Sequence, residues 1–248
     1  MNFHRYRRHE RIFASLLAII ALGACSQQDD TAAQAAAAQA KADAAAAAAK
    51  RTAGLLDLYR KQTQAGEDAA AVDTGRAIVK LSAGSDAAQE VQQTLPAIEQ
   101  RVRDQAEKAR LASLWEYQVA PMMGGTQSTA SIYSNQRING APVQMVLRRH
   151  TQWGQSVFLY GGRFVCKAVC TLPATFDGTP HPLRGFLPPT GEPSVMIKGD
   201  KDFIAALAKA KKIVIPVVLQ DSGQSRELSY DVGGYDAGKW APLPGAKK

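Results

Sequence analysis

Trp115-Glu116-Tyr117-Gln118-Val119 is the stretch at which the sequence changes character, because apolar and polar residues alternate there as in a half-buried β-strand. A turn-rich segment, 121–126, follows it. Short β-type runs bounded by Gly, Pro, Asn or Asp then recur at 128–134, 143–149, 156–160, 163–166, 171–177, 194–198, 213–219 and 227–232. Residues 202–211 have helical spacing instead. The pattern predicts an antiparallel β-sandwich or small barrel with one helix over residues 115–235, with Trp115 in its core or at the domain junction.

Upstream of Trp115 the apolar residues follow a helical period. Residues 54–114 carry apolar stripes interrupted at Gly66 and at 83–86, which predicts an α-helical hairpin with a further long helix. The residues around Leu58 and Gly66 faintly resemble a tetratricopeptide repeat, but the segment holds at most about one and a half units where about three are needed. A short helical hairpin is the favoured interpretation, and the whole chain is expected to be of the α+β class.

Residues 25–53 are dominated by alanine, which supplies 14 of the 20 residues in 31–50. Alanine has the highest helix propensity, but its methyl group buries little surface. We therefore expect a tether, helical or frayed, that lifts the rest of the chain away from a bilayer. A coiled coil is the alternative, although it requires larger residues than alanine at its a and d positions.

The N-terminal segment 1–24 has the features of a signal peptide. Four arginines and one glutamate precede an apolar or small run, 12–23, and Leu22-Gly23-Ala24-Cys25 follows. This motif resembles the lipobox of bacterial lipoproteins, which implies acylation of Cys25, palmitate included, after cleavage. By the same resemblance to Gram-negative lipoproteins, Ser26 in place of aspartate implies the outer membrane, with the protein facing the periplasm and stably anchored. An ordinary signal peptide with an incidental cysteine is the alternative.

Charge and hydropathy exclude several function classes. Removing the arginines and the glutamate of residues 1–24 lowers the formal net charge from +8 to +5, and no block of five or six like charges occurs, so nucleic acid is not an expected partner. No run approaches the roughly 18 apolar residues of a membrane-spanning helix.

Cys166 and Cys170 remain once Cys25 is assigned to lipid. Their spacing is not the C-x-x-C of redox proteins, and in an oxidising compartment an even pair predicts one structural disulfide. Only two histidines, His150 and His181, follow the signal peptide, and neither lies near a second ligand in sequence. We expect no metal and no cofactor.

No catalytic motif stands out. The G-x-S-x-G elbow is absent, His181 sits in a proline-flanked loop, and nothing marks two carboxylates as a pair. The chain is therefore expected not to be an enzyme. Four aromatic residues in or beside predicted loops are candidate partner-binding residues, with core packing as the alternative for each: Trp153, Tyr160, Phe164 and Phe186.

Residues 115–232 also carry a family resemblance. Its elements are the tryptophan-led first strand, the Pro121-Met122 turn, the strand 128–135, the Gly-Arg-Phe-x-Cys run at 162–166 and the helix at 203–211. They resemble a β-domain of exported Gram-negative proteins of mostly unassigned function. They are also loosely similar to invasion-associated locus B-like and type VI secretion-accessory periplasmic domains. The resemblance covers about half the chain, and its motifs are not catalytic.

These features together favour a non-catalytic binding or scaffold module for another envelope component, either a protein or peptidoglycan. A cell-wall-active hydrolase, or an inhibitor of a periplasmic enzyme or toxin, is the alternative. Residues 236–248 are predicted to be a flexible basic tail, and in a purely structural role this tail would contact peptidoglycan.

Overall fold

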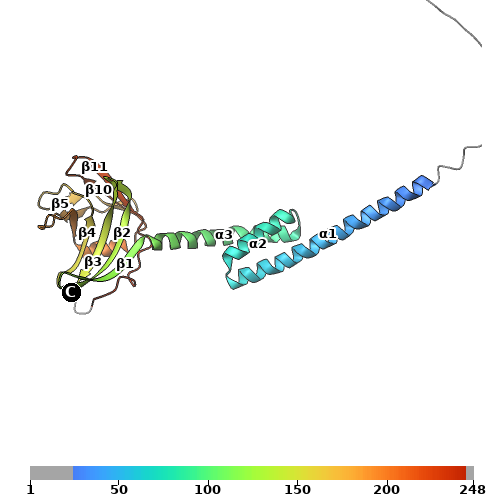
Figure 1. The fold of residues 1–248 in the computed structure, drawn as a ribbon, viewed down its shortest axis with the longest axis horizontal. Helices are drawn as coiled ribbons and strands as arrows, with labels where there is room; N and C mark the ends of the chain where they lie inside the picture. Colours follow the sequence, from blue (N-terminus) through green and yellow to red (C-terminus); the bar gives the residue numbers. More distant parts are fainter. Residues whose placement is uncertain (1–24, 244–248) are drawn as a thin grey trace, which may run out of the picture. The chain divides into compact units, whose positions relative to one another are not determined.

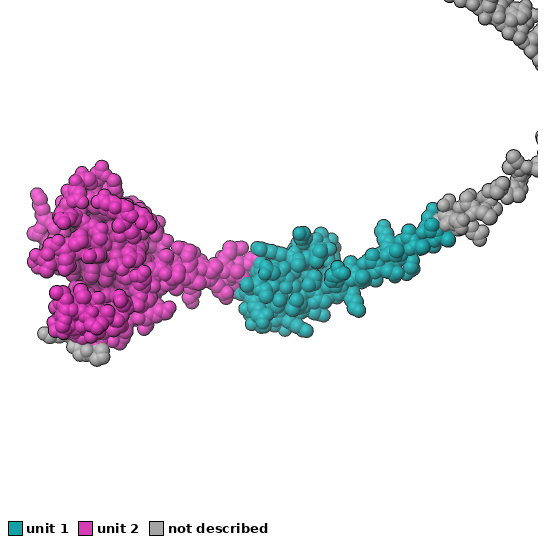
Figure 2. Space-filling model, in the orientation of Figure 1, with its two compact units in different colours: residues 1–98 teal, residues 99–248 magenta. Residues whose placement is uncertain are grey.

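The computed structural model describes residues 25–243, with side chains from residue 31 onward. The predicted signal peptide, the side chain of Cys25 and the last five residues of the predicted tail lie outside the described residues. The chain divides into two compact units, residues 1–98 and 99–248 (Figure 2). Within the described part, no helix is both long enough and apolar enough to cross a membrane.

The first unit is built from three helices, α1 (Cys25–Ala65), α2 (Asp68–Leu81) and the first part of α3 (Asp86–Ser113) (Figure 1). Its small core consists of Tyr59, Ala71, Val72, Ile78, Ala88, Val91, Leu95 and Ile98. The predicted tether and the first helix of the predicted hairpin form one continuous helix, because Gly54 does not interrupt α1. Residues 31–51 of that helix are exposed throughout.

Polar contacts join α1 to α3 at the edge of this core. The guanidinium of Arg60 donates two hydrogen bonds to the carboxylate of Glu90, at 2.8 and 2.6 Å. The hydroxyls of Tyr59 and Thr94 are 2.7 Å apart and share a hydrogen bond. Between them, Gly75 on α2 lets the three helices approach closely, because a Cβ there would lie 3.0 Å from both Leu95 and Tyr59.

The second unit is a two-sheet antiparallel sandwich, which confirms the predicted α+β class. The larger sheet has the order β1-β2-β3-β4-β9-β8-β5, and the smaller has the order β11-β10-β6-β7 (Figure 1). The larger sheet's strands are β1 (Trp115–Met122), β2 (Gly125–Ile138), β3 (Ala141–His150), β4 (Gly154–Tyr160), β5 (Cys170–Leu172), β8 (Leu183–Phe186) and β9 (Ser194–Lys198). The smaller sheet's strands are β6 (Thr175–Phe176), β7 (Thr179–Pro180), β10 (Ile213–Val218) and β11 (Ser225–Tyr230).

Alternate residues of the strands point into a continuous core between the sheets. On β3, for example, Val143, Met145 and Leu147 are fully buried, while Gln144 and Arg148 on the opposite face keep part of their surface in solvent. Helix α4 (Asp200–Leu207) adds Phe203 and Leu207 to the same core. The sheet containing β1 to β4 therefore has one face in the core and one face outside.

Side-chain amides join the two sheets where the register of β2 shifts between Tyr133 and Arg137. The backbone N–H of Ser229 on β11 donates to Oε1 of Gln136 at 2.7 Å, and Nε2 of Gln136 donates to the Ser229 hydroxyl at 2.9 Å. These bonds satisfy the backbone N–H of Ser229 on β11 and the side-chain amide of Gln136, so they link the two sheets beside the register shift.

The predicted flexible tail is wrong for its described part. Trp240 is 1% exposed and belongs to the core of the sandwich. Its indole N–H donates to the carbonyl of Ser128 at 3.1 Å, its ring lies 3.7 Å from the guanidinium of Arg149, and that guanidinium donates to its carbonyl at 2.8 Å. The signal in the sequence was Trp240 itself. Burial of an indole of this size stabilises a core strongly enough to order the basic, Pro-rich segment that carries it.

Candidate functional site

The outer face of β1 to β4 forms an open groove with a volume of about 400 Å³. Strand pairing places its lining residues in rows that run across the sheet. One row contains Glu116, Ser131, Val146 and Phe158, from β1, β2, β3 and β4 in that order. A parallel row contains Gln118, Thr129, Arg148 and Ser156. Because neighbouring strands lie about 4.8 Å apart, the four strands span about 14 Å.

The half of the groove over β1 and β2 is lined mainly by neutral polar side chains, with the carboxylate of Glu116 and the apolar side chain of Met122 beside them. Gln118, Gln127 and Thr129 line it, and their side chains make no hydrogen bond to any other described residue. Gln144, beside them on β3, donates to the Ser131 hydroxyl at 3.0 Å. This half therefore offers amide and hydroxyl groups whose hydrogen-bonding capacity is left to solvent or to a ligand.

Arg148 lies between two aromatic rings at the other side of the groove. Its guanidinium carbon is 5.3 Å from the ring centroid of Trp153 and 5.0 Å from that of Phe158. Its Nε donates to the Ser156 hydroxyl at 3.2 Å, which leaves its two terminal nitrogens without a hydrogen bond to the described residues. Partial burial lowers the pKa of Arg148, while the charge of Glu192 acts in the opposite direction. The groove thus contains a positioned cation that the protein itself only partly neutralises.

The turn between β3 and β4 holds Trp153 against Arg148, and His150 fixes that turn. The imidazole Nδ1 accepts the backbone N–H groups of Gln152 at 3.1 Å and Trp153 at 3.3 Å. Because Nδ1 accepts, Nε2 carries the proton and donates to the Met122 carbonyl at 2.9 Å. Gly125 makes room for the ring, since a Cβ there would lie 2.7 Å from Cε1 of His150. His150 is therefore a positioning residue for the groove.

The structure separates the four predicted partner-binding aromatics. Tyr160 is 45% exposed and lines the groove, and Trp153 is 47% exposed and contacts Arg148. Phe186 is half-buried on β8, outside the groove lining, with the Lys198 ammonium 5.6 Å from its ring. The prediction for Phe164 is wrong, because its ring is 1% exposed and lies in the core.

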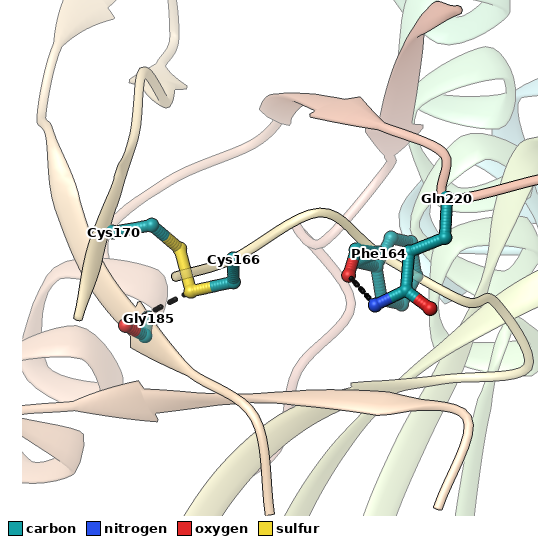
Figure 3. The surroundings of a disulfide bond; sticks show 5 residues. All are labelled: Phe164, Cys166, Cys170, Gly185 and Gln220. Carbon is teal, nitrogen blue, oxygen red and sulfur yellow. Dashed lines mark hydrogen bonds between the residues drawn. A yellow bond between two sulfur atoms is a disulfide. The ribbon is translucent and has the colours of Figure 1, made fainter. Parts of the chain in front are cut away.

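A non-local contact explains the burial of Phe164. The predicted strand 163–166 does not form, and Phe164 instead makes an isolated bridge with Leu219, at the end of β10. Nε2 of Gln220 also donates to the Phe164 carbonyl at 2.8 Å (Figure 3). Sequence alone does not reveal this bridge, since its two residues lie far apart in the chain.

The predicted disulfide between Cys166 and Cys170 is confirmed (Figure 3). The Cys166 sulfur lies 3.4 Å from the Gly185 carbonyl oxygen, a close contact rather than a hydrogen bond because a disulfide sulfur carries no hydrogen. A Cβ on Gly185 would lie 3.4 Å from the Cys170 sulfur and 3.0 Å from Val195, so glycine fits this approach best. Neither cysteine lines the groove, which favours a structural role.

No group of three or more His, Cys, Asp or Glu side chains suited to a metal ion occurs among the residues that the structure describes. His181 packs against Phe176, with ring centroids 4.6 Å apart. Cys25 is the first residue of α1, and its expected acylation stays a prediction.

The groove residues that sequence reasoning missed are Arg148, Phe158 and the glutamines at 118, 127 and 144. The alternation of apolar and polar residues along each strand assigns them to the solvent-facing side of the sheet. It does not show that this side forms a groove. Comparisons with protein-family models, curated proteins and solved structures give no match.

Proposed function

We propose that this chain is an outer-membrane-anchored periplasmic lipoprotein whose β-rich unit is a non-catalytic binding module for another envelope component. The observation that carries the binding role is the groove, where uncommitted polar side chains and aromatic rings surround the positioned guanidinium of Arg148. Binding sites typically combine a concave surface with a few polar groups fixed in place. The proposal assigns recognition to this face of the larger sheet.

The anchoring part of the proposal rests on the lipobox cysteine, Cys25, and on Ser26 after it. Helix α1 begins at Cys25, and its exposed alanine-rich part suits a spacer between a lipid anchor and a folded unit. At about 1.5 Å per residue, residues 31–53 extend about 35 Å.

A cell-wall hydrolase is the second candidate, because two carboxylates, Glu116 and Glu192, line the same groove. Glycosidases use such a pair as acid and base or as acid and nucleophile. Incubating the mature protein with purified peptidoglycan separates the candidates. Release of soluble fragments that both Glu116→Gln and Glu192→Gln abolish would establish the hydrolase, and intact peptidoglycan supports the binding module.

Site-specific photocrosslinking in intact cells tests the binding role. A photoreactive phenylalanine analogue is placed at Tyr160 in the groove or at Val218 on the smaller sheet, two sites of similar exposure at 45% and 40%. We expect a crosslinked product from position 160, either a discrete band or material retained with the cell-wall polymer, that Arg148→Gln weakens, and none from position 218. Identical products from both positions, or none from either, would refute recognition by the groove.

Membrane fractionation tests the anchor separately. The Cys25→Ala variant is expected to leave the outer-membrane fraction and to lose incorporation of labelled palmitate, whereas Ser26→Ala should keep both properties. Unchanged fractionation of Cys25→Ala would remove the localisation proposal without affecting the groove.

A further inference from the structure

We infer that the ligand of the groove is an acidic oligosaccharide, a chain of sugar rings bearing hydroxyl or acylamino groups and a carboxylate that pairs with Arg148. This inference rests on the proposed binding function and names the chemical class of its ligand. Three properties of the groove carry it: the uncommitted amides and hydroxyl, the aromatic side chains, and the guanidinium of Arg148, whose terminal nitrogens form no hydrogen bond to the described residues.

The neutral polar half matches the hydrogen-bonding pattern of sugars. Gln118 and Gln127 each present an amide that donates and accepts, and the Thr129 hydroxyl does the same. A sugar hydroxyl likewise donates and accepts, so each pairing satisfies both partners. A protein partner instead needs a desolvated apolar centre. Here Val146, on the central strand β3, is 6% exposed and flanked by polar residues, and the exposed apolar lining lies at the ends of β1 and β4, in Met122 and Tyr160. The groove therefore has no apolar centre of the kind that a protein partner would desolvate.

The aromatic half supplies flat surfaces beside these polar groups. Phe158 and Tyr160 on β4 both line the groove, and Tyr160 is paired with Gln144 on the adjacent strand β3. A pyranose ring has an apolar face of C–H groups that packs on the electron-rich face of an aromatic ring. Rings and amides on adjacent strands thus allow a single sugar to stack on one side and form hydrogen bonds on the other.

Arg148 gives the preference for an acidic ligand. With its Nε bonded to Ser156, the terminal nitrogens are available for the two-pronged pairing that guanidinium makes with carboxylate. Glu116 and Glu192 also line the groove, so the three charged groups sum to a negative charge. That balance disfavours polyanions such as nucleic acid, so the preference for an acidic sugar chain depends on the local pairing of one of its carboxylates with Arg148.

The span of the groove limits the length of chain it contacts. Four strands cover about 14 Å, the scale of a short oligosaccharide rather than of a single sugar. Cell-wall glycan alternates sugars with and without a lactyl group, whose carboxylate is free where the stem peptide has been removed, so its peptide-free fragments are suitable probes of this class.

Isothermal titration calorimetry of the mature protein tests the inference with two soluble probes. One is a tetrasaccharide of alternating N-acetylglucosamine and N-acetylmuramic acid, which carries carboxylates, and the other is the N-acetylglucosamine tetramer, which carries none. We expect the acidic probe to bind about tenfold more tightly, and Arg148→Gln to remove that difference. The control is Arg226→Gln, which changes an exposed arginine on β11 and should bind like the wild type.

The Gln118→Ala/Thr129→Ala double variant tests the neutral half, and we expect it to weaken both probes by a similar factor. Equal affinity of the wild type for the two probes, or no binding of either at millimolar concentration, would overturn the inference. If in that case photocrosslinking at Tyr160 still gives an Arg148-dependent product that proves to be a protein, the binding function stands with a protein ligand. If neither probe binds and photocrosslinking at Tyr160 gives no Arg148-dependent product, the groove is not a binding site.

Discussion

The imidazole of His150 and the indole of Trp153 lie face to face, with ring centroids 3.8 Å apart and 12° between their planes. The same histidine accepts the backbone N–H of Trp153 and is fully buried. One buried residue therefore holds both the backbone and the ring of an exposed tryptophan that contacts the groove arginine.

Replacing this histidine should destabilise the sandwich. His150→Leu leaves the Met122 carbonyl and the two N–H groups of the turn without their partner, and we expect a loss of about 2 to 4 kcal/mol of unfolding free energy. Trp153→Leu is the matched control, because it removes the stacked ring and keeps all three hydrogen bonds. Urea unfolding measures both variants, and equal losses would mean that stacking rather than hydrogen bonding fixes the turn.

The disulfide should contribute modestly to stability. It joins residues four apart in sequence, and cross-linking so small a loop is worth about 2 kcal/mol in the chain-entropy description. We therefore expect the Cys166→Ala/Cys170→Ala variant to lose about that amount and to remain folded. Val169→Ala, inside the same loop and exposed, is the control and should unfold like the wild type. Non-reducing peptide mapping should show the two cysteines joined, and free thiols would contradict the bridge.

The disulfide and the groove differ in how far sequence could predict them. The bridge depends on the short spacing of the two cysteines and on an oxidising compartment. The spacing can be read directly from the sequence, and the predicted signal peptide implies the compartment. The groove depends on which strands become neighbours: the pairing of β4 with β9, for example, places Tyr160 opposite Ser194 and so brings Glu192, two residues earlier in the chain, to the groove. Such pairing is set by the packing of the whole sandwich, so alternation on single strands showed the outward residues but not the hollow between them.

Aromatic residues illustrate the same limit. Trp153 lies between the predicted strands 143–149 and 156–160, and Phe164 lies in the predicted strand 163–166 next to a Gly-Gly turn. One is 47% exposed and the other 1%, because the bridge to Leu219 draws Phe164 inward while the β3–β4 turn carries Trp153 outward. Non-local contacts decide the outcome for each residue.

Tyr230 should make stability fall at alkaline pH. It is fully buried, its hydroxyl has no hydrogen-bond partner among the described residues, and burial raises its pKa. A tyrosine whose pKa is raised on folding stabilises the fold below its unfolded pKa of about 10, and that contribution falls by about 1.4 kcal/mol per pH unit above it. Burial likewise raises the pKa of Tyr235 to about 12, so it adds to the same loss.

The Tyr230→Phe variant separates the two tyrosines. At pH 7 we expect its unfolding free energy to be unchanged or higher, because the variant removes a buried hydroxyl that lacks a partner. Between pH 10 and 11 its stability should fall less steeply than that of the wild type, with a remaining slope from Tyr235 and Tyr117, whose pKa values burial also raises. Urea titrations at each pH measure this, and parallel curves would show that the Tyr230 hydroxyl is solvated.

Substitution of two helical glycines by larger residues should change the stability of the first unit in opposite directions. Gly54 lies in α1, and a Cβ at this position would have no neighbouring atom within 4 Å, so Gly54→Ala should stabilise the first unit by up to about 1 kcal/mol through helix propensity. Gly75 lies in α2 where a Cβ would already meet Leu95 and Tyr59 at 3.0 Å, so Gly75→Leu should force the helices apart. Thermal unfolding followed by circular dichroism at 222 nm measures both variants. Destabilisation by Gly54→Ala, or tolerance of Gly75→Leu, would show that the three helices do not pack as this core requires.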